Sequence, residues 1–369
     1  MDLTLSAADY NLLLEHVELS PRLERSLRAG LVEGMFLRFS LTDEEAMELT
    51  AVVVFAAAAG ERKRRRALKR LADRLGRKLD LADMSPEVVD EAFGRAGDAY
   101  NNTRRADLGG FSPMELQTLF SNDWSPDTPG LRLRGDPPAG LLVESDVLHN
   151  ARVMLRALAD GGTRATPAGN LNRAFVADML ASLRFREGHL EELRRFNKVI
   201  NEQDAWLVHD LRVVLELARL IRLERGRFRL TKRGRDLLRD DRAGELLALL
   251  VETAFRVFNL GYHDRLPELP EFQNVIAYPL AVLSRQPEGW RVYGALASEL
   301  LHPAIAEVLP RHDHLDFGEA LIRIRVVERL EALGLVEVRR ETHEVTHHLG
   351  RLTHVRRTPL FSAVLEFDL

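Results

Sequence analysis

The chain contains no cysteine, and this absence excludes several classes of site. Disulfide bonds, iron–sulfur clusters, thiolate zinc sites and cysteine nucleophiles all need a residue that none of the 369 positions provides. Long apolar runs are also missing, since Ala51–Ala59 falls far short of the roughly 20 residues that span a membrane. The first ten residues lack the pattern of a secretion signal. We therefore expect a cytoplasmic protein without membrane contact.

The chain also lacks an overall excess of positive charge. Its net charge is −4 and its pI is near 6.3, so any electrostatic contact with nucleic acid must be local. Residues Arg62–Lys78 hold ten Lys or Arg and one acid, Asp73, with Leu68, Leu71 and Leu75 at helical spacing. This pattern predicts a basic amphipathic helix of charge +9 in a chain whose other residues carry −13.

Motifs of the common enzyme classes are absent as well. The sequence has no Walker A phosphate loop and no nucleophile elbow around a serine. Paired acids such as Glu44 and Glu45 lie next to a helix start, where the helix dipole favours them. We therefore expect no enzyme activity, no catalytic residue and no cofactor.

Histidines cluster in the C-terminal part of the chain. The stretch His312–Asp316 resembles the opening of the metallo-β-lactamase signature, but Phe317 stands where that family has histidine. His343–His348 and His354 follow later in the chain. A metal-dependent hydrolase would need three or four ligands that converge in space. Loop histidines are more often exposed polar residues, and we expect no metal site.

The first 120 residues predict a helical domain. Apolar residues recur at helical spacing over Leu3–Leu31, interrupted at Ser20-Pro21, where a serine cap and a first-turn proline can open a new helix. Thr42 and Glu45 predict a capping box for a helix that runs to about Ala59.

A boundary follows this domain. Ser112-Pro113 predicts a short helix through Phe120. Residues 121–140 then contain four prolines and show no periodicity, so we expect a linker over 121–142.

An internal repeat follows the linker. His149–Leu155 aligns with His209–Leu215, and Arg164–Gly169 aligns with Arg229–Gly234. Each copy predicts a helix, a turn, a short strand and a threonine that caps the next helix. The two capping threonines would be Thr166 and Thr231.

The second copy also contains a hairpin signal. Ile221–Leu223 and Phe228–Leu230 are short apolar runs on either side of Glu224–Arg227, a pattern that predicts a tight β-hairpin.

A weaker third copy is predicted near the C-terminus. Ala320–Leu333 is strongly periodic, and Gly334 suits a left-handed C-cap. Leu335–Val338 alternates as a strand, and Leu360–Phe367 provides a second strand. This order is the wing half of a winged helix.

The predicted fold class is therefore mainly α. An N-terminal helical domain (1–120) is followed by two or three winged-helix-like units with short β-hairpins. Their bounds are 143–202, 203–286 with a helical extension, and 287–369.

Four segments carry a resemblance to a known family. They are Leu108–Phe120, Ala165–Val176, Phe228–Leu238 and the stretch from Phe255 through Asn259 and Tyr262 to Gln273, and they are similar to an uncharacterised family of bacterial proteins with winged-helix-like segments. Some of its members end in a Cys-rich zinc motif, which a chain without cysteine lacks. The resemblance spans roughly residues 90–290 and implies a winged-helix-like fold but no activity.

The basic segments are candidate nucleic-acid contacts. In winged-helix proteins that bind DNA, the helix before the hairpin enters the major groove and the wing contacts the backbone. Residues 219–235 hold eight Lys or Arg and one acid, Glu224, and helix 62–78 is about 25 Å long, enough to follow a phosphate backbone. The candidate residues are Arg62, Lys63, Arg64, Arg65, Arg66, Lys69, Arg70, Arg222, Arg225, Arg227, Arg229, Lys232, Arg233 and Arg235.

Two functions remain open on this pattern. The first is a bacterial DNA-binding or regulatory protein whose partner is double-stranded DNA. The second is a non-enzymatic interaction scaffold, because charged runs are often solvated faces and winged helices also serve as packing modules. In the second case the units mediate homodimerisation or dock a protein partner.

Overall fold

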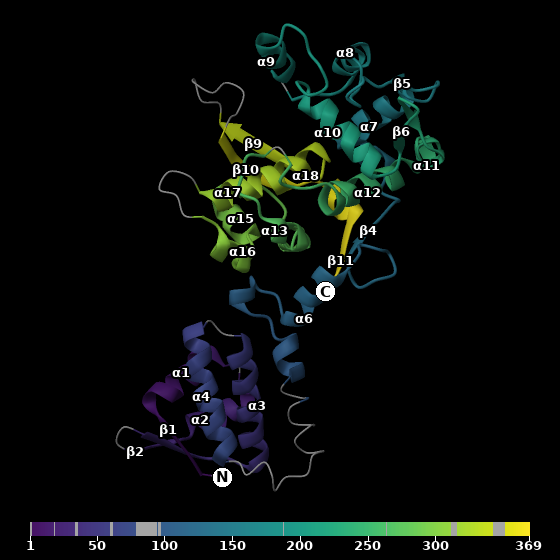
Figure 1. The fold of residues 1–369 in the computed structure, drawn as a ribbon. Helices are drawn as coiled ribbons and strands as arrows, with labels where there is room; N and C mark the ends of the chain where they lie inside the picture. The colour runs from purple at the N-terminus through teal and green to yellow at the C-terminus, as the bar shows by residue number, and fades with distance from the viewer. Residues whose placement is uncertain are drawn as a thin grey trace. The chain divides into compact units, whose positions relative to one another are not determined.

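The computed structural model describes residues 2–17, 19–33, 36–59, 62–78, 94, 97–186, 188–262, 264–310, 316–341 and 351–369. The fold is mainly α with small antiparallel sheets, as predicted (Figure 1). The chain forms two compact units, Met1–Glu115 and Leu116–Leu369. Each unit has its own buried core.

The first unit opens with a sheet that the sequence pattern did not predict. β1 (Asp2–Ser6), β3 (Phe36–Ser40) and β2 (Leu31–Glu33) pair in that order, all antiparallel. The expectation of helix from residue 3 is therefore wrong at the start, because Leu3 and Leu5 alternate with exposed residues and are buried from one face of a strand. Helices α1 (Ala7–His16) and α2 (Pro21–Arg28) follow, each capped by a serine as Ser20-Pro21 predicts for α2.

A helical hairpin completes the described core of the first unit. α3 (Asp43–Ala59) begins at the predicted capping box, where Thr42 and Glu45 exchange hydrogen bonds between side chain and backbone. α4 (Arg62–Lys78) has the predicted bounds and packs along α3. Its leucines at 68, 71 and 75 are fully buried, so the predicted amphipathic helix is confirmed. The short helix η2 (Ala106–Leu108) follows later.

The junction of the two units contains the expected helix. α6 (Pro113–Ser121) begins with reciprocal hydrogen bonds between Ser112 and Glu115. The stretch expected to be a linker then includes β4 (Gly130–Leu133) and η3 (Ala139–Glu144). β4 pairs with β11 (Leu365–Asp368) near the other end of the chain.

A first structural repeat lies over residues 146–230 in the second unit. It runs α7 (Asp146–Ala157), β5 (Thr163–Arg164), α8 (Arg173–Ser182), α9 (His189–Phe196), α10 (Trp206–Leu217), β6 (Ile221–Glu224) and β7 (Arg227–Leu230). Its sheet order is β5-β7-β6. The hairpin β6–β7 is the one that the sequence predicts. α11 (Lys232–Leu237) follows it.

A second structural repeat over 277–357 has the same element order. It runs α14 (Ala277–Arg285), β8 (Arg291–Val292), α15 (Tyr293–Leu300), α16 (Pro303–Val308), a long helix, β9 (Val336–Glu341) and β10 (Arg351–Arg357). The long helix consists of α17 (Phe317–Ile322), the π-helical η6 (Arg323–Val327) and α18 (Glu328–Ala332). The sheet order is β8-β10-β9, again with the first strand beside the third.

The two repeats have equivalent hydrogen bonds as well as the same element order. Arg219 and Gly334 both end a helix in the left-handed conformation, with φ of 58° and 76°, as predicted for Gly334. The next residue of each is a leucine whose carbonyl accepts from the backbone N–H of a threonine after the third strand, Thr231 or Thr358. Each threonine then caps the following helix.

These pairings revise the units that the sequence suggests. Residues 143–202 and 203–286 were expected to be separate copies, but β5 of the first pairs with β7 of the second, so they share one sheet. The aligned helices α7 and α10 are the first and fourth helices of one repeat. Thr166 does not cap a helix, because its hydroxyl accepts from Asn170 in a turn, and Asn172 caps α8 instead.

The C-terminal hairpin also differs from expectation. Its second strand is β10, and the prediction of a strand over 360–367 is wrong for its first half. Thr358 and Pro359 open α19 (Pro359–Val364) at this point, as a cap and a first-turn proline do. Only the final residues, in β11, are extended.

A connector joins the two repeats. It contains η4 (Asp240–Arg242), α12 (Ala243–Glu252), the π-helical η5 (Thr253–Val257) and α13 (Pro270–Asn274). The amide of Gln273 donates to the carbonyls of Arg256 and Phe258 at the end of η5. A buried ion pair, Arg325 to Asp264 at 2.6 Å, ties the second repeat to this connector.

Candidate nucleic-acid interface

The β6–β7 hairpin places a row of cations on one edge of the second unit. Arg225 and Gly226 form its two-residue turn with φ of 49° and 71°, the left-handed conformation that such tight turns require. Phe228 points into the core and is fully buried, so the residues on either side of it, Arg227 and Arg229, face outward from the strand.

Three more cations come from α11, which follows β7 directly. Thr231 accepts the N–H of Gly234 and starts the helix, and this fixes the direction in which Lys232, Arg233 and Arg235 leave the surface. In Figure 1, β6 and α11 lie together at one side of the second unit. We call the full set the basic edge: Arg222, Arg225, Arg227, Arg229, Lys232, Arg233 and Arg235.

Little negative charge opposes the basic edge. Among its seven cations in the described structure, Arg222 has an acidic partner, Glu224 at 3.2 Å. Arg227 donates to the carbonyls of Gly161 and Gly162, and two others donate to single backbone carbonyls. All except the half-buried Arg227 are exposed. The structure therefore brings the seven predicted wing residues together as an accessible positive surface.

The helix before the hairpin has a different character. Over Trp206–Leu217, the one Lys or Arg is Arg212, and it is buried. The exposed residues of α10 are Trp206 and Leu217. No arginine, lysine, asparagine or glutamine of this helix is available to hydrogen-bond a base edge.

Arg212 is instead part of a buried polar cluster around Glu202. The Glu202 side chain is fully buried and accepts hydrogen bonds from Arg212, from His209 Nδ1 at 2.8 Å and from the backbone N–H of Leu171. His209 Nε2 lies 3.0 Å from the hydroxyl of Tyr262 in the connector. This cluster ties the segment before α8, α10 and the connector to one another.

The electrostatics of the cluster follow from burial and pairing. Burial alone raises the pKa of Glu202, but the hydrogen bonds from His209 and Arg212 outweigh burial and hold that pKa below its ordinary value. Burial raises the pKa of the neighbouring Glu216 despite its contact with Arg212. Sequence reasoning missed this cluster, because its members come from four separate segments.

The basic helix α4 forms a separate surface on the first unit. Arg65, Arg66, Lys69 and Arg70 are exposed, and Arg64 is half-buried. The predicted residues Arg62 and Lys63 belong to α4, but their side chains lie outside the described part. Farther along the helix, Arg74 pairs with Asp9 at 2.9 Å. The outward face of α4 is thus basic, opposite its buried leucines.

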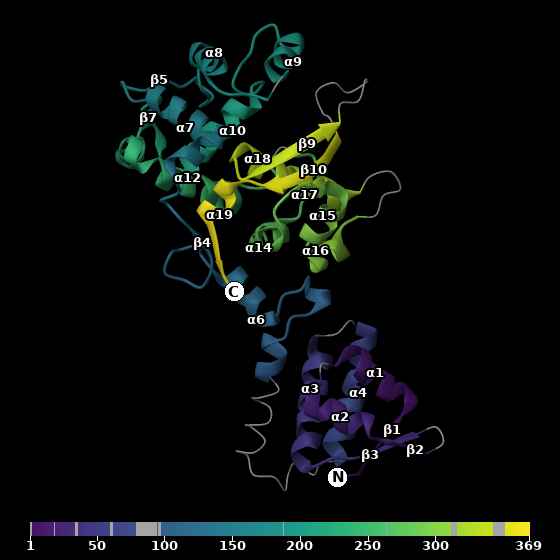
Figure 2. The same cartoon turned by 180° about the vertical axis from the view of Figure 1, so that it is seen from behind.

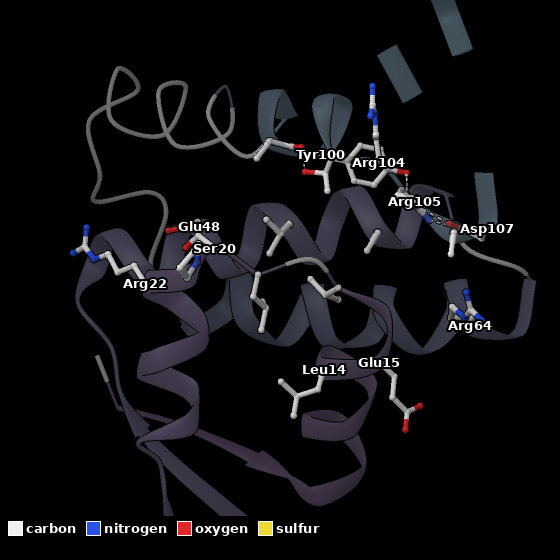
Figure 3. Close-up of a pocket in the computed structure, with 18 of the residues that line it drawn as sticks. Leu14, Glu15, Ser20, Arg22, Glu48, Arg64, Tyr100, Arg104, Arg105 and Asp107 are labelled. Carbon is white, nitrogen blue, oxygen red and sulfur yellow. Dashed lines mark hydrogen bonds and ion pairs between the residues drawn. The ribbon is translucent and has the colours of Figure 1, made fainter. Parts of the chain in front are cut away.

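A cavity of about 1090 Å³ lies in the first unit (Figure 3). Its apolar lining includes Leu14, Val17 and Val52, and charged residues surround it. Three of the four arginines among these form ion pairs: Arg22 with Glu44, Arg104 with Glu115 and Arg105 with Asp107. Tyr100 accepts a hydrogen bond from Arg105 at 2.6 Å. This internal pairing gives no sign of a particular ligand.

The histidine clusters cannot be placed. His312–Asp316 lies outside the described residues apart from Asp316, which caps α17. His343–His348 also lies outside them, and His354 is in β10. Over the residues that the structure does describe, no group of three His, Asp or Glu could hold a metal ion. Within the same residues, no helix is both long and apolar enough to cross a membrane.

One family comparison matches part of the chain. Residues 143–244 match the family described as the Y4jL N-terminal domain. The matched span is less than a third of the chain and runs from just before α7 to the start of α12, so it contains the first repeat with the basic edge. The match supports resemblance to an uncharacterised family and names no activity. No curated protein and no solved structure matches the chain.

Proposed function

We propose that the repeats 146–230 and 277–357 are two winged-helix units and that the chain binds double-stranded DNA through its phosphate backbone. The winged-helix assignment is supported by the order helix, strand, helices, hairpin in both repeats and by the shared position of the first strand beside the third. The β6–β7 hairpin is then the wing of the first unit.

The observation that carries the binding proposal is the basic edge. Of its seven Lys or Arg residues, only Arg222 has an acidic partner among the described residues, in a chain whose net charge is −4. Arginine suits phosphate because its planar guanidinium donates two parallel hydrogen bonds. Backbone contacts of this kind release counterions and bind DNA of any sequence.

The composition of α10 supports binding without base recognition. A recognition helix reads bases through arginine, lysine, asparagine or glutamine on its exposed side, and α10 offers none. Arg212 and His209 of this helix hydrogen-bond the buried Glu202 instead. We therefore infer that the wing and α11 hold the backbone, with α4 as an additional sequence-independent contact from the first unit.

The test is salt-dependent binding of the full chain to two duplexes of unrelated sequence. The variant Arg225→Gln, Arg229→Gln, Lys232→Gln removes three exposed cations of the basic edge that have no acidic partner among the described residues. Each neutralised phosphate adds about 0.9 to the slope of log K against log salt, so this variant should reduce the slope by about 2–3 for both duplexes.

A matched control removes the same charge elsewhere. Arg134, Arg186 and Arg239 in the second unit are exposed and paired with acids, and changing all three to glutamine should leave the slope close to that of the unchanged chain. Binding that is undetectable at low salt would reject the proposal. An equal loss in both variants would also reject it, since the basic edge would then have no special role.

A second candidate function is an interaction scaffold. Phe196, Val199 and Trp206 are each more than half exposed around α9 and the start of α10, and exposed apolar residues of this size often mark protein contacts. If this patch is the main functional surface, Phe196→Ala with Trp206→Ala should abolish a stable homodimer or complex and leave DNA binding unchanged.

A further inference from the structure

We propose that the hairpin of the second repeat is a second DNA-backbone site, so that one chain can hold two duplexes together. This inference rests on the proposed function of the basic edge and adds a separate surface to it. The second site consists of Trp290, Arg339, Arg351 and Arg356, beside β8 and on β9 and β10.

The geometry of these residues supports a preformed cationic surface. The guanidinium carbon of Arg339 lies 4.0 Å from the centre of the Trp290 ring, and that of Arg356 lies 4.6 Å from it. In the strand register Arg339 is opposite His354, two residues from Arg356, so Arg339 and Arg356 lie on the same face of the sheet. Stacking on Trp290 holds both cations with little remaining freedom.

The charges of this face remain available to a ligand. Arg339 and Arg351 are exposed, and neither has an acidic partner among the described residues. Arg356 pairs with Glu337 at 2.6 Å, but both side chains stay about two-fifths exposed. A phosphate oxygen can therefore approach all three arginines from solvent.

The long helix of the second repeat offers no comparable surface for a DNA backbone. None of the residues 317–333 is fully exposed. Arg325 is buried in its ion pair with Asp264, and Arg329 donates to the carbonyl of Leu260 in the connector. The long helix is thus not a cationic surface of this repeat, whereas Arg339 and Arg351 on the strands are exposed.

The two surfaces lie on different sides of the second unit. In both views β9 and β10 lie on one side of the second unit, while β6 and α11 (Figure 1) and β7 (Figure 2) lie on the other. Both surfaces belong to the same compact unit, so a duplex bound at each would be held by one chain.

A bridging assay tests this directly with the full chain. A biotinylated duplex is immobilised, and a fluorescent duplex of unrelated sequence is captured only if the protein holds both. We expect capture by the unchanged chain. The variant Arg339→Gln, Arg351→Gln, Arg356→Gln should lose capture but keep its Kd for a single duplex within about twofold, because distant sites act independently.

Salt provides a second readout. The second site has three arginines and the basic edge has seven cations, so capture of the fluorescent duplex should be lost at a salt concentration at which single-duplex binding persists. The control Arg134→Gln, Arg186→Gln, Arg239→Gln should still bridge. Circular dichroism checks that the variants are folded. If the triple variant is unfolded, the single variants Arg339→Gln and Arg351→Gln are used in its place.

Three other outcomes of the bridging assay would contradict the proposal of a second DNA site. If the unchanged chain binds one duplex but captures no second, the inference is wrong and the basic edge stands. If the second-site variant bridges as well as the unchanged chain, bridging comes from α4 or from pairs of chains, and the inference is again wrong. If single-duplex binding itself is absent, the proposed function fails first.

Discussion

At the scale of single residues, Glu202 is a fully buried carboxylate with three hydrogen-bond partners in the first repeat. It accepts hydrogen bonds from Leu171, His209 and Arg212, although it sits in the short segment between α9 and α10. An ionised carboxylate without exposure is stable only with such partners. The geometry of the first repeat therefore depends on one buried negative charge.

We predict that Glu202→Gln lowers the free energy of unfolding by about 3 kcal/mol, because it removes one of the two carboxylates that pair with the buried Arg212. Pairing holds the Glu202 pKa below its ordinary value of 4.5. The stabilisation of the fold by the ionised Glu202 is therefore fully present above pH 4.5 and is lost as the pH falls through the lowered pKa. Urea denaturation at neutral and acidic pH measures both effects. The exposed Glu191→Gln serves as control; a variant that is equally destabilised at all pH values would contradict the role of the charge.

Residue-scale prediction from sequence succeeded for four helix caps, was wrong for the cap expected at Thr166 and missed this cluster. The caps at Ser20, Thr42, Ser112 and Thr231 act on N–H groups three residues away, so the local pattern contains all the information. Glu202 contacts Leu171 and, through His209, reaches Tyr262. Neither spacing nor residue type marks such distant partners.

At the scale of elements, short strands were the least predictable. The β6–β7 hairpin carries its own turn residues and was predicted within one residue of its bounds. β1 and β10 have no adjacent turn signal of that kind, and each depends on a partner strand for its hydrogen bonds. The two-residue β5 pairs with β7, which is far from it in the sequence.

That contact can be tested through two neighbouring glycines before β5. Gly161 and Gly162 both have positive φ, 83° and 71°. A Cβ on Gly161 would meet nothing within 4 Å, whereas one on Gly162 would overlap the carbonyl oxygen of Phe228 in β7. Gly161→Ala should therefore cost about 1 kcal/mol for its conformation, and Gly162→Ala about 3 kcal/mol because it also separates the strands.

Thermal unfolding of both alanine variants provides the measurement. The comparison isolates the strand contact, since the two substitutions share the same conformational cost. Equal losses of stability would show that β5 does not lie against β7 as described.

At the scale of the whole molecule, strands near the two ends of the second unit pair with each other. β4 and β11 pair although they lie more than two hundred residues apart. Leu365 in β11 is almost fully buried opposite Leu133. Pairing over such a distance depends on the complete fold, which is why the sequence suggested a linker at β4.

Leu365→Ala should destabilise the second unit by about 2–4 kcal/mol, as loss of a buried leucine does. All three tryptophans of the chain, at 124, 206 and 290, lie in this unit. Tryptophan fluorescence should therefore show the whole shift in one cooperative transition. Val308→Ala, at an exposed position of the same unit, should leave the midpoint unchanged, and a shift confined to Trp124 would argue against a single cooperative unit.

The position of β5 has a consequence for how the chain is made. Its partner β7 is the last strand of the repeat, so α7, α8 and α10 leave the ribosome before the sheet that completes their core can form. The apolar faces of these helices stay uncovered during that interval, which favours association with other nascent chains or with chaperones. Slower translation between residues 164 and 230 would lengthen this vulnerable period.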